Sequence, residues 1–268
     1  AIIAQKYKKK HVWHLREFGE DDYECVSLRK NYICFMNQNT TRFIAISKAV
    51  ENCWINKGIR KNKINCIYNG VDVKKFKRTP SLVQEEKLRI CMTGSISPGK
   101  GHMQLFEAVN LLPDDVKDRI EVDVFGTGVK EYEYKLKKFI KSKRLENIIR
   151  FLGYEKNISE KLNSYHIGVV CSRAEGFGRV TVEYMLSGLC VIVSNTGANT
   201  EIINNGIDGY TYEYGNPDSL KNIICDLFYN MGKIAMVRSV AVSKASLLFT
   251  SEVNAKKIYE LYVELCKG

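Results

Sequence analysis

Two glutamates eight positions apart, Glu175 and Glu183, bracket a turn that carries Gly176 and Gly178. An apolar run at 167–171 precedes this turn, and apolar residues at helical spacing follow it, so the glycines lie where a strand becomes a helix. The first N–H groups of a helix lack intrahelical partners and face the positive end of its dipole, which suits a phosphate. Carboxylates would repel bare phosphate but accept hydrogen bonds from hydroxyl groups. The segment therefore predicts binding of a phosphate that is joined to sugars.

The same residues also have a purely structural explanation. A glutamate in the first turn of a helix complements the helix dipole, and a Gly-x-Gly turn after a strand can serve close packing alone. Spacing within this segment leaves both explanations open. The rest of the sequence has to decide between them.

Composition limits the class of protein. A chain of 268 residues with 45% hydrophobic residues can bury the cores of one large or two medium domains. Its apolar runs are too short to span a bilayer, and the first ten residues lack the apolar segment of a signal peptide. Nine cysteines without a Cys-x-x-Cys pair predict reduced core residues, with neither disulfides nor metal ligands among them. We expect a cytoplasmic protein.

The formal net charge of +11 favours an acidic partner, for which there are three candidates: nucleic acid, anionic lipid or a nucleotide-linked substrate. No aromatic RNA-binding signature, zinc finger or basic zipper is present, so we expect no nucleic-acid partner. Most of the basic clusters are interpreted as solvated faces of helices and loops. Peripheral adhesion to the anionic inner face of a membrane stays open. The clusters are 6–11, 57–63, 74–78 and 135–144.

Strands and helices alternate from residue 88 onward in the rhythm of a doubly wound parallel α/β domain. The near-continuous apolar runs are typical of strands that are buried on both faces. The expected strands are 88–93, 120–125, 148–152, 167–171 and 191–194, and the expected helices are 102–112, 130–143, 159–163, 180–187, 200–204, 218–230, 233–246 and 251–266.

The first 78 residues have no opening strand and no glycine-rich loop of their own. We interpret them as part of a second α/β domain whose beginning is missing, followed by a charged linker at 74–86 that contains Pro80. The expected strands are 12–15, 43–46 and 64–68, with helices within 25–37 and at 48–57.

The order of five further segments gives the chain a resemblance to a known family. They are 68–72 (YNGVD), 94–101 (GSISPGKG), 126–128 (GTG), 195–203 (NTGANTEII) and 205–209 (NGIDG). Together with 175–183, they make residues 11–265 resemble the retaining glycosyltransferases of family four. The resemblance implies two facing Rossmann-like domains of the glycosyltransferase B type, the N-terminal one incomplete. The implied parts are 1–78, the C-terminal piece of an acceptor-side domain; 79–250, the nucleotide-sugar domain; and 251–268, a helix that packs back towards the N-terminal part.

The resemblance also assigns roles to residues in the cleft between the domains. It implies that Glu183 binds the ribose hydroxyls, that Glu175 contacts the transferred sugar, and that Lys100 neutralises the diphosphate at the start of the helix. The implied catalytic residues are Lys100, Glu175 and His14. The implied donor-binding residues are Gly94, Ser95, Lys100, Glu175, Phe177, Gly178, Arg179, Val180 and Glu183.

One position departs from the family pattern. The family usually has an arginine where this chain has Ser95, which carries no charge. Either Arg173 or Arg179 supplies the missing charge, or the donor is held more loosely. Arg179 could instead be a solvated residue of the helix surface.

A histidine near the end of the first expected strand offers a weaker signal. His14 resembles a histidine that lies near the donor sugar in many relatives, although a histidine at a strand end often only makes surface hydrogen bonds. We expect Arg16 and Glu17 to line the acceptor side.

The charges that develop during glycosyl transfer favour this arrangement. Negative charge builds on the departing diphosphate, and fixed cations and N–H groups would stabilise it. No Asp-x-Asp motif is present, so we expect no metal and no cofactor besides the nucleoside diphosphate sugar. The hypothesis is transfer with retention, which the resemblance implies, to a saccharide or lipid-linked saccharide acceptor in polysaccharide biosynthesis. A non-catalytic nucleotide-sugar binding module and a charge-driven nucleic-acid binder are the alternatives. We expect these 268 residues alone to be inactive.

Overall fold

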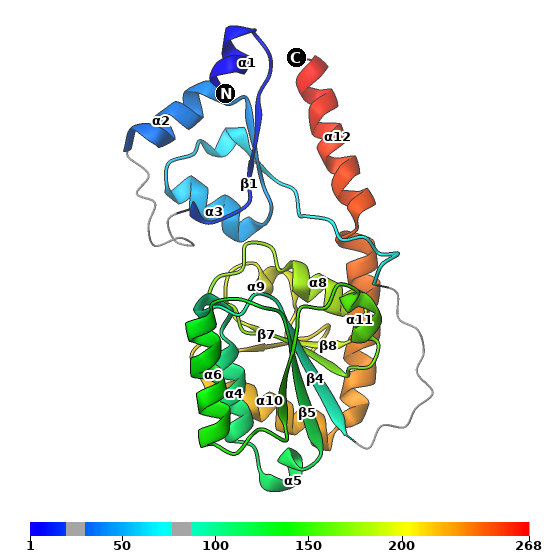
Figure 1. Ribbon diagram of the computed structural model, residues 1–268. Helices are drawn as coiled ribbons and strands as arrows, with labels where there is room; N and C mark the ends of the chain where they lie inside the picture. The colour runs from blue at the N-terminus through cyan, green and yellow to red at the C-terminus, as the bar shows by residue number, and fades with distance from the viewer. Residues whose placement is uncertain (20–29, 77–86, 268) are drawn as a thin grey trace.

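Two parallel sheets of unequal size organise the computed structural model, which describes residues 1–19, 30–76 and 87–267. The smaller part lies above the larger one in Figure 1, and α12 rises from the larger part alongside the smaller. The small sheet has the order β1-β2-β3 and the large sheet the order β6-β5-β4-β7-β8-β9. All the strand pairs are parallel, as expected for two Rossmann-like sheets. The strands are β1 (Val12–Leu15), β2 (Arg42–Ala45), β3 (Ile64–Cys66), β4 (Leu88–Thr93), β5 (Ile120–Phe125), β6 (Ile149–Gly153), β7 (Ile167–Val170), β8 (Cys190–Ser194) and β9 (Tyr210–Tyr212).

The order of the large sheet creates a switch point between β4 and β7. The chain adds β5 and then β6 on one side of β4, and it returns to add β7, β8 and β9 on the other. Ligands of doubly wound sheets bind outside the carboxyl ends of the strands at such a point. Here those ends lead into the loops 94–101 and 171–178, the two loops that carry the predicted phosphate-binding residues.

Helices cover both faces of the large sheet, which is why its central strands are apolar throughout. Every residue of β7 and β8 is buried. Side chains of α4, α6 and α10 pack on one face, and those of α7, α8 and the second half of α11 pack on the other. The helices of this part are α4 (His102–Asn110), α5 (Asp114–Lys117), α6 (Lys130–Ser142), α7 (Ile158–Leu162), α8 (Arg179–Leu186), α9 (Asn199–Ile202), α10 (Pro217–Tyr229), α11 (Met231–Leu248) and α12 (Ser251–Lys267), with the 3-10 turn η3 (Pro98–Lys100) before α4.

The smaller part contains the expected strands and helices, together with a short helix, α1, that was not expected. Its strands begin or end within two residues of the expected limits, and α3 begins at Lys48 because the Ser47 side chain caps it by accepting the N–H of Val50 at 3.1 Å. Residues 25–29 of the expected first helix and 77–86 of the expected linker lie outside the described residues. The helices are α1 (Ile2–Lys6), α2 (Lys30–Asn39) and α3 (Lys48–Asn56), with the 3-10 turn η2 (Lys61–Lys63).

The chain passes between the two parts at two adjacent points. The N–H of Val71 donates to the Phe249 carbonyl at 2.9 Å, and the N–H of Ser251 donates back to the Val71 carbonyl at 3.1 Å. Gly70 makes this approach possible, because a Cβ there would lie 2.5 Å from Cα of Ser251. Beyond this point α12 packs Leu261 against the small sheet.

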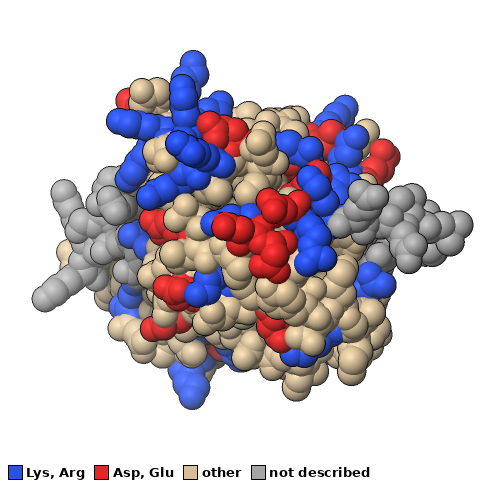
Figure 2. All heavy atoms as spheres, turned by 90° about the horizontal axis from the view of Figure 1, so that it is seen from below, with Lys and Arg blue, Asp and Glu red and all other residues tan. Residues whose placement is uncertain are grey.

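The basic cluster at 135–144 lies on α6 and its end. Lys135, Lys137 and Lys138 are exposed, while Leu136 faces the core. Figure 2 shows Lys and Arg gathered at the upper left of the face seen from below. Because α6 begins at the carboxyl end of β5 and runs away from it, the last lysines lie at the opposite end of the domain from the switch point. This cluster is a solvated helix face, as expected.

All eight cysteines within the described residues are free. None of the helices described here combines the length and the apolar character that a membrane span requires.

Candidate functional site

A cavity of about 490 Å³ opens at the switch point, between the two parts of the molecule. One wall comes from the small part, through residues after β1 and at the end of β2, and the other from the loops after β4 and β7. Its lining residues are Arg16, Glu17, Ile46, Asn69, Ser95, Ser97, Gly99, Lys100, Arg173, Ala174, Glu175, Gly176, Phe177, Gly178 and Arg179. Six of the predicted site residues therefore line one cavity.

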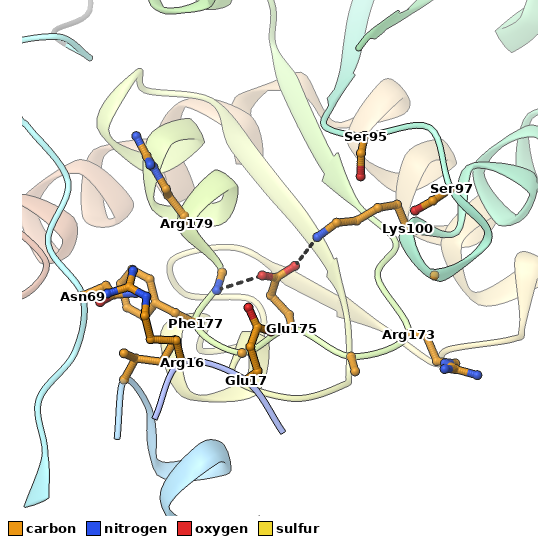
Figure 3. Close-up of a pocket in the computed structure, with 15 residues that line it drawn as sticks. Arg16, Glu17, Asn69, Ser95, Ser97, Lys100, Arg173, Glu175, Phe177 and Arg179 are labelled. Carbon is orange, nitrogen blue, oxygen red and sulfur yellow. Dashed lines mark hydrogen bonds and ion pairs between the residues drawn. The ribbon is translucent and has the colours of Figure 1, made fainter. Parts of the chain in front are cut away.

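Glu175 is held in the middle of this cavity by contacts on both oxygens (Figure 3). The Lys100 ammonium lies 3.1 Å from Oε2, and the N–H of Gly178 donates to Oε1 at 3.3 Å. The main chain is fixed as well, because the N–H of Ala198 donates to the Glu175 carbonyl at 2.8 Å. A Cβ at Gly197 would lie 2.4 Å from that carbonyl oxygen, so only glycine fits there. The carboxylate is thus set in place before any ligand binds.

The start of α8 lies between this cavity, which Arg179 lines, and a second one, which Val180 lines. Gly178 has a φ of 86°, the left-handed region that glycine adopts without strain, and it turns the chain into the helix. The first intrahelical bond of α8 runs from Val182 N–H to the Gly178 carbonyl at 3.1 Å, so the N–H groups of Arg179 and Val180 precede it. These groups lie at the positive end of the helix, where an anion is stabilised.

The loop that carries Lys100 is packed against the end of β7. Gly101 has a φ of 73°, and a Cβ on it would lie 2.1 Å from the Cys171 carbonyl oxygen. The N–H of Arg173 donates to the Gly99 carbonyl at 2.8 Å, which ties the two loops together. The side chain of Lys100 stays 37% exposed, so its charge is available to a ligand.

A second cavity of about 370 Å³ adjoins the first and shares Ser95 with it. It contains Glu183, whose side chain is only 12% exposed and whose Oε1 lies 2.8 Å from Nε of Arg179. Burial raises the pKa of Glu183, and Arg179 opposes that shift. The residues lining this second cavity are Thr93, Gly94, Ser95, Phe125, Gly126, Thr127, Tyr154, Glu155, Ile158, Val180 and Glu183. The two glutamates of the sequence motif therefore lie in adjoining cavities on either side of Ser95 and the start of α8.

His14 is not among the described residues that line either cavity. It lies on β1, half-buried, and burial together with the nearby Arg16 lowers its pKa. Arg16 and Glu17, which were expected on the acceptor side, do line the larger cavity. The small part comes very close here, because a Cβ on Gly176 would lie 3.0 Å from the Arg16 carbonyl oxygen.

The two arginines offered as substitutes for the family arginine at Ser95 both line the larger cavity. Figure 3 shows both guanidinium groups directed away from the Lys100–Glu175 pair. Arg179 is 75% exposed and is paired with Glu183. Among the described residues, Lys100 forms the ion pair with Glu175.

Sequence reasoning missed several residues of the two cavities. Asn69 and Ser97 lie within the motif segments 68–72 and 94–101 but received no role. Tyr154 and Glu155 follow β6 directly, and the carboxyl end of a parallel strand was the signal that could have identified them.

Comparisons with known proteins identify the family of the chain. Residues 73–235, more than half of the chain, match the family described as "Glycosyl transferases group 1". The chain belongs to the group 1 glycosyl transferases. The glycosyltransferase is 25% identical over 278 residues to an uncharacterized glycosyltransferase of Methanocaldococcus jannaschii, which covers 97% of this chain and 69% of that protein. It is 27% identical over 237 residues to an uncharacterized 41.2 kDa protein in the cps region of Klebsiella pneumoniae, covering 83% of this chain and 62% of that protein.

A solved structure covers nearly the whole glycosyltransferase chain. The crystal structure of Anabaena HepE in complex with UDP has a TM-score of 0.90 and 25% sequence identity, over 98% of this chain and 74% of that one. HepE has also been solved in complex with UDP-glucose, with a TM-score of 0.86. The resemblance read from the sequence motifs is thereby confirmed. Because the chain spans only 62% and 69% of the two relatives above, it corresponds to part of a longer protein in each case.

Proposed function

We propose that this glycosyltransferase moves a sugar, with retention, from a UDP-sugar to a saccharide or lipid-linked saccharide acceptor without a metal ion. The observation that carries the proposal is the arrangement of Lys100, Glu175 and the start of α8 around one cavity, with Glu183 in the adjoining one. The UDP and UDP-glucose complexes of HepE support uridine as the base and a hexose as the sugar. This choice of base and sugar, like the donor roles given below, is carried over from related proteins.

The two cavities divide the donor into parts by charge. The diphosphate fits between Lys100 and the N–H groups of Arg179 and Val180, since both are positive. Glu175 and Glu183 flank that position, and each accepts hydrogen bonds from hydroxyls, Glu183 from the ribose and Glu175 from the transferred sugar. The smaller cavity, lined by Gly94, Ser95 and Tyr154 among others, is left for the nucleoside.

The chemistry of this chain's residues follows from the charges. The bond from the anomeric carbon to the diphosphate breaks, the acceptor oxygen bonds to the same face of that carbon, and the proton of the acceptor hydroxyl passes to an oxygen of the departing diphosphate. Lys100 and the α8 amides stabilise the negative charge on the departing UDP. The amides are fixed by the start of the helix, whereas the Lys100 ammonium has to turn from Glu175 to the diphosphate. Arg16 and Glu17 lie on the opposite wall, where the acceptor approaches. His14 would contribute either indirectly, through Arg16, or after a movement of the end of β1 towards the cavity.

Isothermal titration of this chain with UDP and UDP-glucose tests the proposal. We expect Lys100→Ala and Glu183→Ala each to weaken UDP-glucose binding by about 10–100-fold, because each removes hydrogen bonds that involve a charged group. The exposed Glu146→Gln, which has no described side-chain partner, should bind like the unchanged chain. Addition of EDTA should leave the affinity unchanged if no metal is needed.

Turnover separates the enzyme from a non-catalytic binding module. The full-length protein with UDP-glucose and a saccharide acceptor should release UDP, and Lys100→Ala should reduce kcat/KM by about 100-fold or more. Binding without UDP release over a range of acceptors would favour the binding module. Tight binding of DNA or RNA that falls steeply with salt and ignores both substitutions would replace both hypotheses.

A further inference from the structure

Glu201 of the large part makes its hydrogen bonds to the small part. Its carboxylate accepts the N–H of Lys48 on Oε2 at 2.8 Å and the N–H of Ala49 on Oε1 at 2.6 Å. The hydroxyl of Tyr68 also donates to Oε2, at 2.9 Å. These three bonds join residues that are more than 130 positions apart in the sequence, and they bridge the same gap as the cavity.

The two amides belong to the first turn of α3, a helix of nine residues. The first intrahelical bond of α3 is made by the N–H of Glu51, so the earlier N–H groups need partners from outside the helix. Ser47 accepts the N–H of Val50, and Glu201 supplies the partner for the two remaining groups. A carboxylate is also favoured at this end by the helix dipole. The first turn of α3 in the small part is therefore capped by a residue of the large part.

Tyr68 adds a donor of the right kind. Burial, and after it the hydrogen bond to Glu201, raises the pKa of Tyr68, so the phenol keeps its proton and donates it. Its ring packs against Phe177 of the site loop with centroids 6.2 Å apart, and against Phe249 at 5.5 Å. Tyr68 thus connects Glu201 to the same loop that carries Glu175.

The helix that carries Glu201 is rigidly joined to the site. Ala198, which precedes α9, donates its N–H to the Glu175 carbonyl, and Asn199 accepts the Thr181 hydroxyl of α8 at 3.1 Å. Only Thr200 separates Asn199 from Glu201. A shift of Glu201 would therefore be transmitted to both the Glu175 loop and the start of α8.

We propose that Glu201 is a positioning residue that sets the distance between the Glu175 loop and the wall formed by Arg16 and Glu17, by capping α3 across the cleft. The inference rests on the proposed function for its catalytic consequence. The contact itself does not depend on that function. Glu201 is not among the described residues that line either cavity, so it acts through Glu175.

Residue-resolved hydrogen exchange of the amides of Lys48 and Ala49 measures the contact directly. We expect Glu201→Ala to speed the exchange of both amides by about tenfold or more, because two charge-assisted bonds are lost. Tyr68→Phe should have a smaller effect, since it removes one bond and leaves the amides capped. Glu146→Gln removes the same charge at an exposed position and should leave both rates unchanged.

Titrations with the same variants test the consequence for the site. We expect Glu201→Ala to weaken UDP-glucose binding about tenfold and to lower kcat in the full-length protein, while UDP alone, held by the large part, loses much less affinity. Tyr68→Phe should change both in the same direction but less. The thermal midpoint of each variant identifies any that fail to fold, and Tyr68→Phe keeps the test valid if Glu201→Ala does so.

The outcomes separate the inference from the proposed function. If Glu201→Ala folds and both amides exchange at the original rate, the capping contact does not exist in solution and the inference is wrong. If the amides respond but donor affinity and kcat do not, the contact is only structural and the positioning role is wrong. If the unchanged chain binds no nucleotide sugar, the proposed function fails, and the exchange rates still decide whether the two parts are joined here.

Discussion

Replacement of Glu175 by glutamine should change the affinities for UDP and UDP-glucose in opposite directions. In the structure without ligand, Glu175 lies 3.1 Å from the Lys100 ammonium, the group we assign to the diphosphate. UDP must therefore draw Lys100 away from Glu175, and loss of the carboxylate charge removes that competition. The sugar of UDP-glucose, by contrast, uses Glu175 itself as a hydrogen-bond acceptor in the function we propose.

The exposures of the two side chains set the magnitude of each effect. Lys100 is 37% exposed and Glu175 is 17% exposed, so water screens the ion pair and its contribution falls in the range of about 0.2–1 kcal/mol. Release of Lys100 therefore strengthens UDP binding by about fivefold at most. Hydrogen bonds from sugar hydroxyls to a charged acceptor contribute about 1.5–3 kcal/mol, which corresponds to a loss of about 10–100-fold for UDP-glucose.

Isothermal titration of the unchanged chain and Glu175→Gln with both ligands measures the two effects in one experiment. The ratio of the UDP to the UDP-glucose affinity is the decisive quantity, because any general loosening of the cavity changes both ligands equally. A variant in which both affinities fall by the same factor would refute the division of the site between Lys100 and Glu175. Glu146→Gln serves as the control for loss of one negative charge.

Three further predictions concern stability. Burial raises the pKa of Glu183, so its ionisation lowers the stability of the fold as the pH rises above about 4.3, the ordinary glutamate value. Glu183→Gln should therefore have a higher thermal midpoint than the unchanged chain at pH 7, and the difference should disappear below about pH 4.3. The donor affinity of the same variant should fall about 10–100-fold. Gly101→Ala should lower the free energy of unfolding by about 3 kcal/mol in denaturant titrations, because Gly101 has a left-handed φ and a Cβ there would clash with the main chain. Gly99 has open space around its Cβ position, so Gly99→Ala should change the free energy of unfolding by less than about 0.5 kcal/mol. Asp123 is fully buried and accepts two bonds from Arg150 at 2.8 and 2.9 Å, whereas the Arg150 side chain is 45% exposed. Asp123→Asn should therefore cost about 1.5–3 kcal/mol of stability without changing the UDP affinity of the folded protein. An equal loss of affinity would contradict the separation of Asp123 from the site.

Apolar runs carried most of the information about the large sheet. The expected limits 88–93 and 120–125 coincide with β4 and β5, because a strand buried on both faces must be apolar along nearly its whole length. The short elements escaped this reasoning. The strand β9 has only three residues, Tyr210–Tyr212, and α5 has four after Pro113, so neither repeats a pattern often enough to be recognised.

The candidate site, like the fold, could be predicted from the sequence only in part. Its large-part wall follows from local sequence, since Lys100, Gly178 and Glu175 all lie in loops at the carboxyl ends of predicted strands. The opposite wall depends on how the two parts face each other, and no local pattern encodes that. The contact of Glu201 with the α3 amides joins an acidic residue to main-chain groups, which leave no trace in the sequence. Likewise, the spacing of Arg179 and Glu183 allowed an ion pair without requiring one.

The two acids of the motif are not equivalent, and the difference follows from their surroundings. Glu175 has a cation and an amide N–H beside it, so its charge is already compensated before the sugar binds. Glu183 is more deeply buried, and among the described residues its charged partner is the exposed Arg179. Burial therefore makes its ionised form less favourable, which raises its pKa. A ribose that donates two hydroxyls to Glu183 would relieve that cost, whereas a ligand without a ribose would not. The smaller cavity should therefore discriminate for the nucleoside more strongly than the larger one discriminates for the sugar.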